Sequence, residues 1–237
     1  MNPGEPFRGV RGSRRGARAR ARPARGGLAA PGPGGHGPLA ESGRVSPGDH
    51  VLITAASSSV GLAALQIARH IGAIPIATTR GADKEQRLLD AGAAHVIVTG
   101  EEGLPARVKE ITGGEGVRLA FDPVAGPGVE TLARGIAPGG FLVVYGALDP
   151  RPTPLPNARS YPALTSSTYT LFEITTNPER LRRAVAFVGA GLASGTLAPV
   201  VDRTFDLADI AEAHRYMAAN GQVGKIVVTV THDDTAA

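Results

Sequence analysis

Residues 51–68 decide the fold, and their sequence is VLITAASSSVGLAALQIA. An apolar run of strand character leads into a patch of very small residues, which opens into a helix rich in alanine and leucine. This is the strand–turn–helix order of a dinucleotide-binding unit. The start of a helix presents free N–H groups and the positive end of its dipole, and both attract a phosphate. The stretch therefore predicts a pyrophosphate-binding turn.

The glycine pattern of this turn departs from G-x-G-x-x-G, because Ala56, Ser58 and Gly61 stand at the three glycine positions. Neighbouring serine hydroxyls add hydrogen-bond donors for a phosphate. The candidate phosphate-binding residues are Ser57, Ser58, Ser59, Val60 and Gly61. Serines also cap helices that bind nothing, and that interpretation stays open. The strand before the turn and the helix after it favour the cofactor.

The composition excludes several kinds of site. The chain of 237 residues is long enough for one or two domains. It has no cysteine, which excludes disulfides, a thiolate nucleophile and zinc held by cysteines. No apolar run approaches the ~20 residues that span a bilayer, and no secretory signal follows Met1, so we predict a cytoplasmic protein that does not enter membranes. The absence of tryptophan and the scarcity of other aromatics argue against nucleic-acid stacking platforms.

The basic charge is concentrated at the start of the chain. Residues 1–44 hold nine arginines and two glutamates, a balance of +7, so the remainder carries −3 of the total of +4. This leader is rich in Arg, Gly, Ala and Pro, which predicts disorder. It is neither amphipathic nor Ser-rich, as a transit peptide would be. A tail that binds nucleic acid or another polyanion stays open. We favour the interpretation that the leader is translated from GC-rich DNA upstream of, or out of frame with, the true coding region.

The chain from residue 45 alternates between strand and helix patterns. Apolar runs predict strands over 50–55, 74–79, 96–98, 119–122 and 141–145. Helices are predicted from the serine turn to residue 71 and over 82–91, 105–111 and 129–136. Strict alternation with short connections predicts an α/β fold, a doubly wound parallel sheet of the Rossmann type.

The alternation breaks after Gly146. Five prolines between residues 149 and 162 predict an extended loop. Beyond it the patterns predict a sixth strand over 168–174, helices over 178–192 and 207–219, and strands over 200–205 and 225–230. We therefore expect a leader over 1–44, a Rossmann domain over 45–195 and a C-terminal strand–helix–strand segment over 196–237.

The end of the second predicted strand indicates which cofactor the turn prefers. NAD sites place an acid there for the ribose 2′-hydroxyl, whereas NADP sites supply cations. This chain has Thr79, Arg80 and Lys84 in that region, and its nearby acid, Asp83, is expected to cap the following helix. The pattern predicts NADPH. A solvated helix start with incidental charges is the alternative.

Two further strand ends are candidates for lining the cofactor, because ligands bind beyond the carboxyl ends of parallel strands. The residues there are Asp122, Val124, Gly146 and Ala147. A turn-starting role before proline explains Asp122 at least as well. None of the six histidines lies at ligand spacing to another, so no metal site is predicted, and His214 is expected to be a packed residue.

From residue 44 onward, about four fifths of the chain resembles the medium-chain dehydrogenase/reductase superfamily, in its zinc-free quinone oxidoreductase (zeta-crystallin-like) branch and among related zinc-binding alcohol dehydrogenase-like proteins. The stretches that carry the resemblance are PGDHVLI (47–53), the turn over 55–61, LDAGAAHVI (89–97), FDPV (121–124), PGG (138–140) and GKIV (224–227). The resemblance implies NADPH-dependent hydride transfer to quinones or activated enones, with the 2′-phosphate at Lys84 and no zinc. It also implies a homodimer through the sheet edge near residues 168–171. Some members place a tyrosine where this chain has Thr99.

Members of this superfamily begin with a GroES-like catalytic domain, where this chain has its Arg/Gly leader. By analogy, segment 196–237 would complete that domain, so we expect exposed apolar surface and unpaired strand edges there, with a tendency to associate. Three functions stay open: an NADPH-dependent quinone or enone reductase, impaired by the missing domain; a catalytically silent nucleotide-binding fragment; and nucleic-acid association through the leader. No catalytic residue is predicted.

Overall fold

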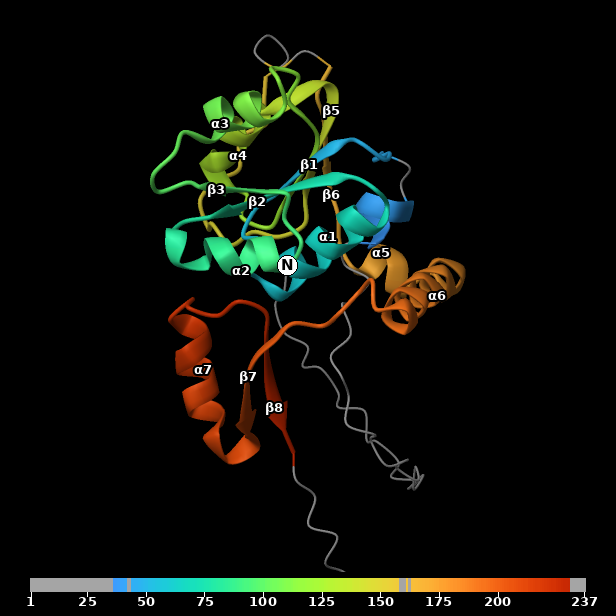
Figure 1. Cartoon of the computed structure of the whole chain (residues 1–237), viewed down its shortest axis with the longest axis vertical. Coiled ribbons are helices and arrows are strands. Elements are labelled where there is room, and N and C mark those ends of the chain that lie inside the picture. Colours follow the sequence, from blue (N-terminus) through green and yellow to red (C-terminus); the bar gives the residue numbers. More distant parts are fainter. Residues whose placement is uncertain (1–35, 42–43, 158–160, 162, 231–237) are drawn as a thin grey trace, which may run out of the picture.

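A computed structural model of the chain describes residues 36–41, 44–157, 161 and 163–230. Its centre is a six-stranded sheet of order β3-β2-β1-β4-β5-β6, in which every neighbouring pair is parallel (Figure 1). This strand order is that of the Rossmann fold, as predicted. The strands are β1 (His50–Ile53), β2 (Ile74–Thr79), β3 (His95–Val98), β4 (Val117–Asp122), β5 (Ile136–Val144) and β6 (Thr165–Thr168).

Helices cover both faces of the sheet, because successive residues of each buried strand point to opposite sides. Val51 and Ile53 of β1 join a core with α1, α2, α5 and α6, whereas Leu52 joins a second core with α3 and α4. The helices are α1 (Ser59–His70), α2 (Glu85–Asp90), α3 (Leu104–Ile111), α4 (Val129–Ala133), α5 (Phe172–Thr175) and α6 (Pro178–Ser194). Short helical turns are η1 (Gly37–Glu41), η2 (Ala82–Lys84), η3 (Gly126–Gly128) and η4 (Leu207–Asp209).

A second, two-stranded parallel sheet is formed by β7 (Val201–Asp206) and β8 (Lys225–Thr229). The helix α7 (Ile210–Ala218) connects the two strands in the chain and lies beside them (Figure 1). We call residues 201–230 the C-terminal unit. Two fifths or more of the surface of five large apolar side chains there is exposed: Val201, Leu207, Ile210, Met217 and Val230. Among the described strands, β7 and β8 pair only with each other. The expected exposed apolar surface and unpaired edges are therefore present.

The sixth strand differs from its prediction. It is β6, over Thr165–Thr168, whereas Phe172–Thr175 forms the helix α5. The prediction of a strand over 168–174 is therefore wrong. β6 has the sequence TSST at the edge of the sheet, and no apolar pattern marks such an exposed strand. Ile174, the last residue of the predicted strand, is buried in the first core and belongs to α5, which packs against α6. The homodimer through this edge stays a prediction.

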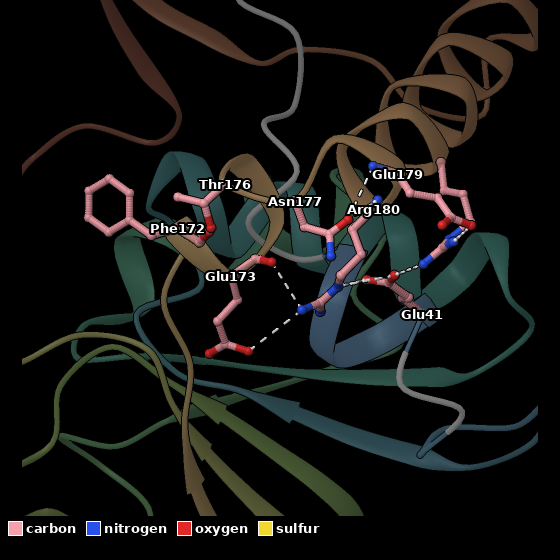
Figure 2. A network of polar contacts seen from close by, with 8 residues as sticks. Glu41, Phe172, Glu173, Thr176, Asn177, Glu179 and Arg180 are labelled. Atoms are coloured by element: carbon pink, nitrogen blue, oxygen red, sulfur yellow. Dashed lines mark hydrogen bonds and ion pairs between the residues drawn. The ribbon is translucent and has the colours of Figure 1, made fainter.

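Part of the predicted leader is folded. Leu39 in η1 is fully buried in the first core. The Glu41 carboxylate accepts hydrogen bonds from Arg180 at 3.2 Å and from Arg183 at 2.8 Å, both on α6 (Figure 2). The prediction of disorder up to residue 44 is therefore wrong for residues 36–41. The expectations for residues 1–35, including nucleic-acid association, lie outside the described residues. Within the described part, no helix is long and apolar enough to cross a membrane.

Candidate nucleotide-binding site

The turn between β1 and α1 is shaped by one glycine and one serine. Ser58 is the N-cap of α1, and its Oγ accepts a hydrogen bond from the Gly61 amide at 3.0 Å. A Cβ on Gly61 would lie 2.6 Å from the Ala56 oxygen and 2.7 Å from its Cα. Gly61 therefore stands at the third glycine position of the dinucleotide pattern and lets the first turn of α1 approach the backbone of the preceding turn closely. The turn keeps a helix N-cap and a close backbone approach although two of the three glycines of the pattern are absent.

The other predicted residues of this turn surround the start of the helix. Ser57, Ser59 and Val60 are all partly exposed. Tyr145, directly after β5, lies near Ser58 of this turn and is not among the predicted site residues. Its ring stacks on Phe121 with centroids 4.0 Å apart. Its buried hydroxyl lies near Ser58 without a hydrogen bond of normal geometry to any described residue, and burial raises the pKa of Tyr145. The sequence signal that could have identified Tyr145 is its position directly after the apolar run of a predicted strand.

The turn after β2 carries the two predicted cations in different settings. Thr79 is buried and its Oγ1 donates to the Gly81 oxygen at 3.1 Å, so its hydroxyl is used within the turn. Arg80 is exposed and has no ion-pair partner in the part of the chain that the structure describes. Lys84 is partly buried, which lowers its pKa. Asp83 makes no capping hydrogen bond, so the expected cap is wrong.

The Lys84 ammonium contacts the chain far beyond the turn. Its Nζ donates to the carbonyl oxygen of Asn220 at 2.6 Å and to that of Gln222 at 3.2 Å. Both carbonyls belong to the connection between α7 and β8. Arg80 is therefore exposed to solvent at the turn after β2, whereas Lys84 is hydrogen-bonded to the C-terminal unit.

Asp122 at the end of β4 has a structural role. Its carboxylate is 1% exposed and accepts hydrogen bonds from Thr54 Oγ1, at the end of β1, and from the Ala125 amide at 2.7 Å. Burial raises the pKa of this carboxyl. These contacts join two strand ends and shape the following loop. The geometry agrees with the turn-starting interpretation of Asp122 rather than with a direct contact to a ligand.

The loops after β4 and β5 are joined by their backbones. The Val124 oxygen accepts from the Asp149 amide at 2.9 Å. A Cβ on Gly146 would lie 2.7 Å from the Pro123 oxygen, so glycine permits this close approach. Val124 is partly exposed and Ala147 is exposed. Because β1 pairs with both β2 and β4, and β4 with β5, the carboxyl ends of these four strands meet at one edge of the sheet.

Potential metal ligands, His214 and a cavity were the other candidates for a functional site outside this edge of the sheet. The described residues contain no group of three or more His, Asp or Glu side chains that could hold a metal. His214 on α7 is exposed, so the expectation that it is packed is wrong. A cavity of about 500 Å³ near Lys109, Arg134 and Tyr161 lies at the start of β5, not at the carboxyl ends of the strands.

Comparison with known proteins identifies the family. Residues 91–228 match the family described as "Zinc-binding dehydrogenase". This chain belongs to that family. It falls within the medium-chain dehydrogenase/reductase superfamily, in the quinone oxidoreductase-like branch, and its six-stranded domain is an NAD(P)-binding domain of that type. The resemblance inferred from the sequence is confirmed.

Several relatives carry informative names. The structure of Escherichia coli quinone oxidoreductase complexed with NADPH superimposes with a TM-score of 0.77 at 30% identity, over 84% of this chain and 62% of that chain. A 2-haloacrylate reductase from Burkholderia sp. is 29% identical over 80% of this chain and 58% of its own length. A phenolphthiocerol/phthiocerol polyketide synthase polypeptide of Mycobacterium tuberculosis is 32% identical over 81% of this chain. That match takes up 9% of the synthase polypeptide. The chain thus spans less than two thirds of each of these relatives.

Proposed function

We propose that this chain binds NADPH at the edge where β1, β2, β4 and β5 end, and forms the cofactor-binding part of a quinone or enone reductase. The observation that carries the proposal is the turn after β2, where exposed Arg80 lacks an ion-pair partner among the described residues. Its position is where dinucleotide sites distinguish a ribose 2′-hydroxyl from a 2′-phosphate. A cation there favours the phosphate.

The residues of the edge fit the remaining parts of the cofactor. The start of α1, with Ser57 to Gly61, would hold the pyrophosphate, and Arg80 with Lys84 would hold the 2′-phosphate. Val124, Gly146 and Ala147 offer small or backbone groups to the nicotinamide half. Bound NADPH supplies a hydride for an electron-poor conjugated carbon. We include no zinc in this proposal, because the described residues do not offer it a set of ligands.

The acceptor class is supported by the relatives. The E. coli structure is named for quinone reduction and the Burkholderia enzyme for reduction of a haloacrylate, and both acceptors contain a conjugated, electron-poor double bond. A nucleotide-binding module without turnover is the second candidate. It is supported by the candidate site, whose named residues are assigned to the nucleotide and none of them to the acceptor.

Fluorescence titration with NADPH and NADH tests the proposal. Arg80→Gln should weaken NADPH binding about tenfold, which is about 1.4 kcal/mol, and leave NADH binding unchanged. Arg182→Gln on the exposed face of α6 is the matched control and should change neither. Oxidation of NADPH by a simple quinone then separates a reductase from a silent module. Failure of the wild-type chain to bind either nucleotide would contradict both candidates.

A further inference from the structure

One nearly buried carboxylate joins the C-terminal unit to the nucleotide-binding domain. Asp202 on β7 has a side chain that is only 5% exposed. It accepts a hydrogen bond from Arg87 Nη2 on α2 at 2.6 Å and another from the Tyr216 hydroxyl on α7 at 2.6 Å. Arg87 Nη2 also lies 3.4 Å from the Val223 oxygen and donates to it. Asp202 therefore holds Arg87 of α2 beside α7, and Arg87 in turn contacts the segment that leads into β8.

That segment, residues 219–224, is called the return turn here. It contacts the candidate site at two places. Its carbonyls accept from the Lys84 ammonium, three residues before Arg87. Its last amide, of Gly224, donates to the Ser57 oxygen at 3.0 Å in the turn before α1. The return turn therefore lies against both the proposed 2′-phosphate position and the proposed pyrophosphate position.

These contacts hold the Lys84 ammonium without cancelling its charge. A lysine ammonium has three N–H donors, and the carbonyls of Asn220 and Gln222 take two of them. Carbonyls carry no net charge, so these two hydrogen bonds leave the ammonium positive. A free lysine side chain would lose up to about 2 kcal/mol of rotamer freedom on binding. A held lysine has already lost it, so a phosphate binds at lower entropic cost.

We propose that Asp202 is a positioning residue for cofactor choice: through Arg87 and the return turn it holds the Lys84 ammonium where the 2′-phosphate of NADPH binds. This inference rests on the proposed function. It assigns part of the preference for NADPH to a side chain that does not touch the cofactor and lies more than a hundred residues from Lys84 in the sequence.

Simple electrostatics and a positioning role predict opposite effects on NADPH binding when the charge of Asp202 is removed. Asp202 is an acid close to Lys84, so removing its charge should by Coulomb's law strengthen binding of an anion there. If Asp202 positions Lys84, removing its charge releases Arg87 and the return turn. NADPH binding then weakens, and NADH, which has no 2′-phosphate, binds as before.

The test is the dissociation constant of each nucleotide for Asp202→Asn, measured on the full chain by fluorescence titration. We expect a loss of about fivefold to tenfold for NADPH and a change of less than about twofold for NADH, which is about 1–1.4 kcal/mol of selectivity. Asp206→Asn is the matched control, because Asp206 lies on the same strand but bonds to Thr229 rather than to the return turn. Tyr216→Phe, which removes one of the two hydrogen bonds, should give a smaller shift in the same direction if Asp202→Asn folds poorly.

Each other outcome overturns the inference. Equal weakening of both nucleotides would show a general structural role, and tighter NADPH binding would show that charge alone acts. If Lys84→Met loses selectivity for NADPH while Asp202→Asn and Tyr216→Phe keep it, the proposed function stands and the positioning role fails. If the wild-type chain binds neither nucleotide, both fail together.

Discussion

Gly61 shows how a single missing side chain sets the geometry of the candidate site. A Cβ there would meet the backbone of Ala56, which cannot move away as the end of a flexible side chain could. We expect Gly61→Ala to destabilise the protein by about 1–3 kcal/mol, the usual cost of overpacking a closely packed site. Urea denaturation measures the change.

The control for that substitution is Gly189 on α6. It is exposed, and an added Cβ would meet nothing within 4 Å. Gly189→Ala should stabilise the protein by about 0.5–1 kcal/mol, because alanine restricts the unfolded chain more than glycine does. Equal effects at both positions would contradict the close approach of α1 to the backbone of Ala56.

The sequence predicts some features of the candidate site and not others. The role of Gly61 follows from the spacing of the turn, and the buried setting of Asp122 follows from its place at a strand end. The partners of Lys84 could not be predicted, because they are backbone carbonyls 136 and 138 residues away. Carbonyls are present in every residue, so no residue type marks them.

At the scale of elements, η1 is attached to α6 by charge as well as by its apolar core residue. Burial acts to raise the pKa of Glu41, but the hydrogen bonds from Arg183 and Arg180 outweigh it, so the pKa is lowered. A carboxyl whose pKa is lower in the folded state stabilises the protein above its unfolded pKa. That contribution is lost as the pH falls through its folded pKa.

Glu41→Gln should therefore cost about 1 kcal/mol at neutral pH, the upper range for a partly exposed ion pair. The difference in unfolding free energy between wild type and variant should shrink as the pH falls below about 4.5, the ordinary value for glutamate. Denaturant titrations over a pH series measure it. A difference that grows toward acid pH would contradict the pairing of Glu41 with α6.

Elements with strong apolar patterns were predicted well, and those without them were not. The buried strands β1, β2 and β4 lie close to their expected positions because they carry continuous apolar runs. β6 was misplaced because its four residues are polar and mostly exposed. η1 was missed because one buried leucine in an Arg/Gly/Pro-rich leader gives no periodicity.

At the scale of the whole molecule, stability should be unevenly distributed. The three apolar residues of β1 are fully buried, whereas five of the six residues in β7 and all five in β8 are partly or largely exposed. Regions with little buried apolar surface open at lower free energy than the core. The C-terminal unit is therefore expected to open while the six-stranded sheet stays intact.

Native-state hydrogen exchange measures this difference. Amides of β7 and β8 should exchange through openings that cost less free energy than those of β1 and β4, with little dependence on added urea. The amides of β1 and β4 should exchange only through global unfolding. Equal opening energies for both sheets would show that the chain unfolds as one cooperative unit.

The hydrogen bond from Gly224 to Ser57 also sets an order of events during synthesis. A ribosome releases a chain from its N-terminus, and the strands of the six-stranded sheet all emerge before residue 200. The serine turn, by contrast, meets this backbone partner only after residue 224 has left the exit tunnel. The nucleotide-binding edge therefore acquires this contact only after every strand of the six-stranded sheet has been synthesised.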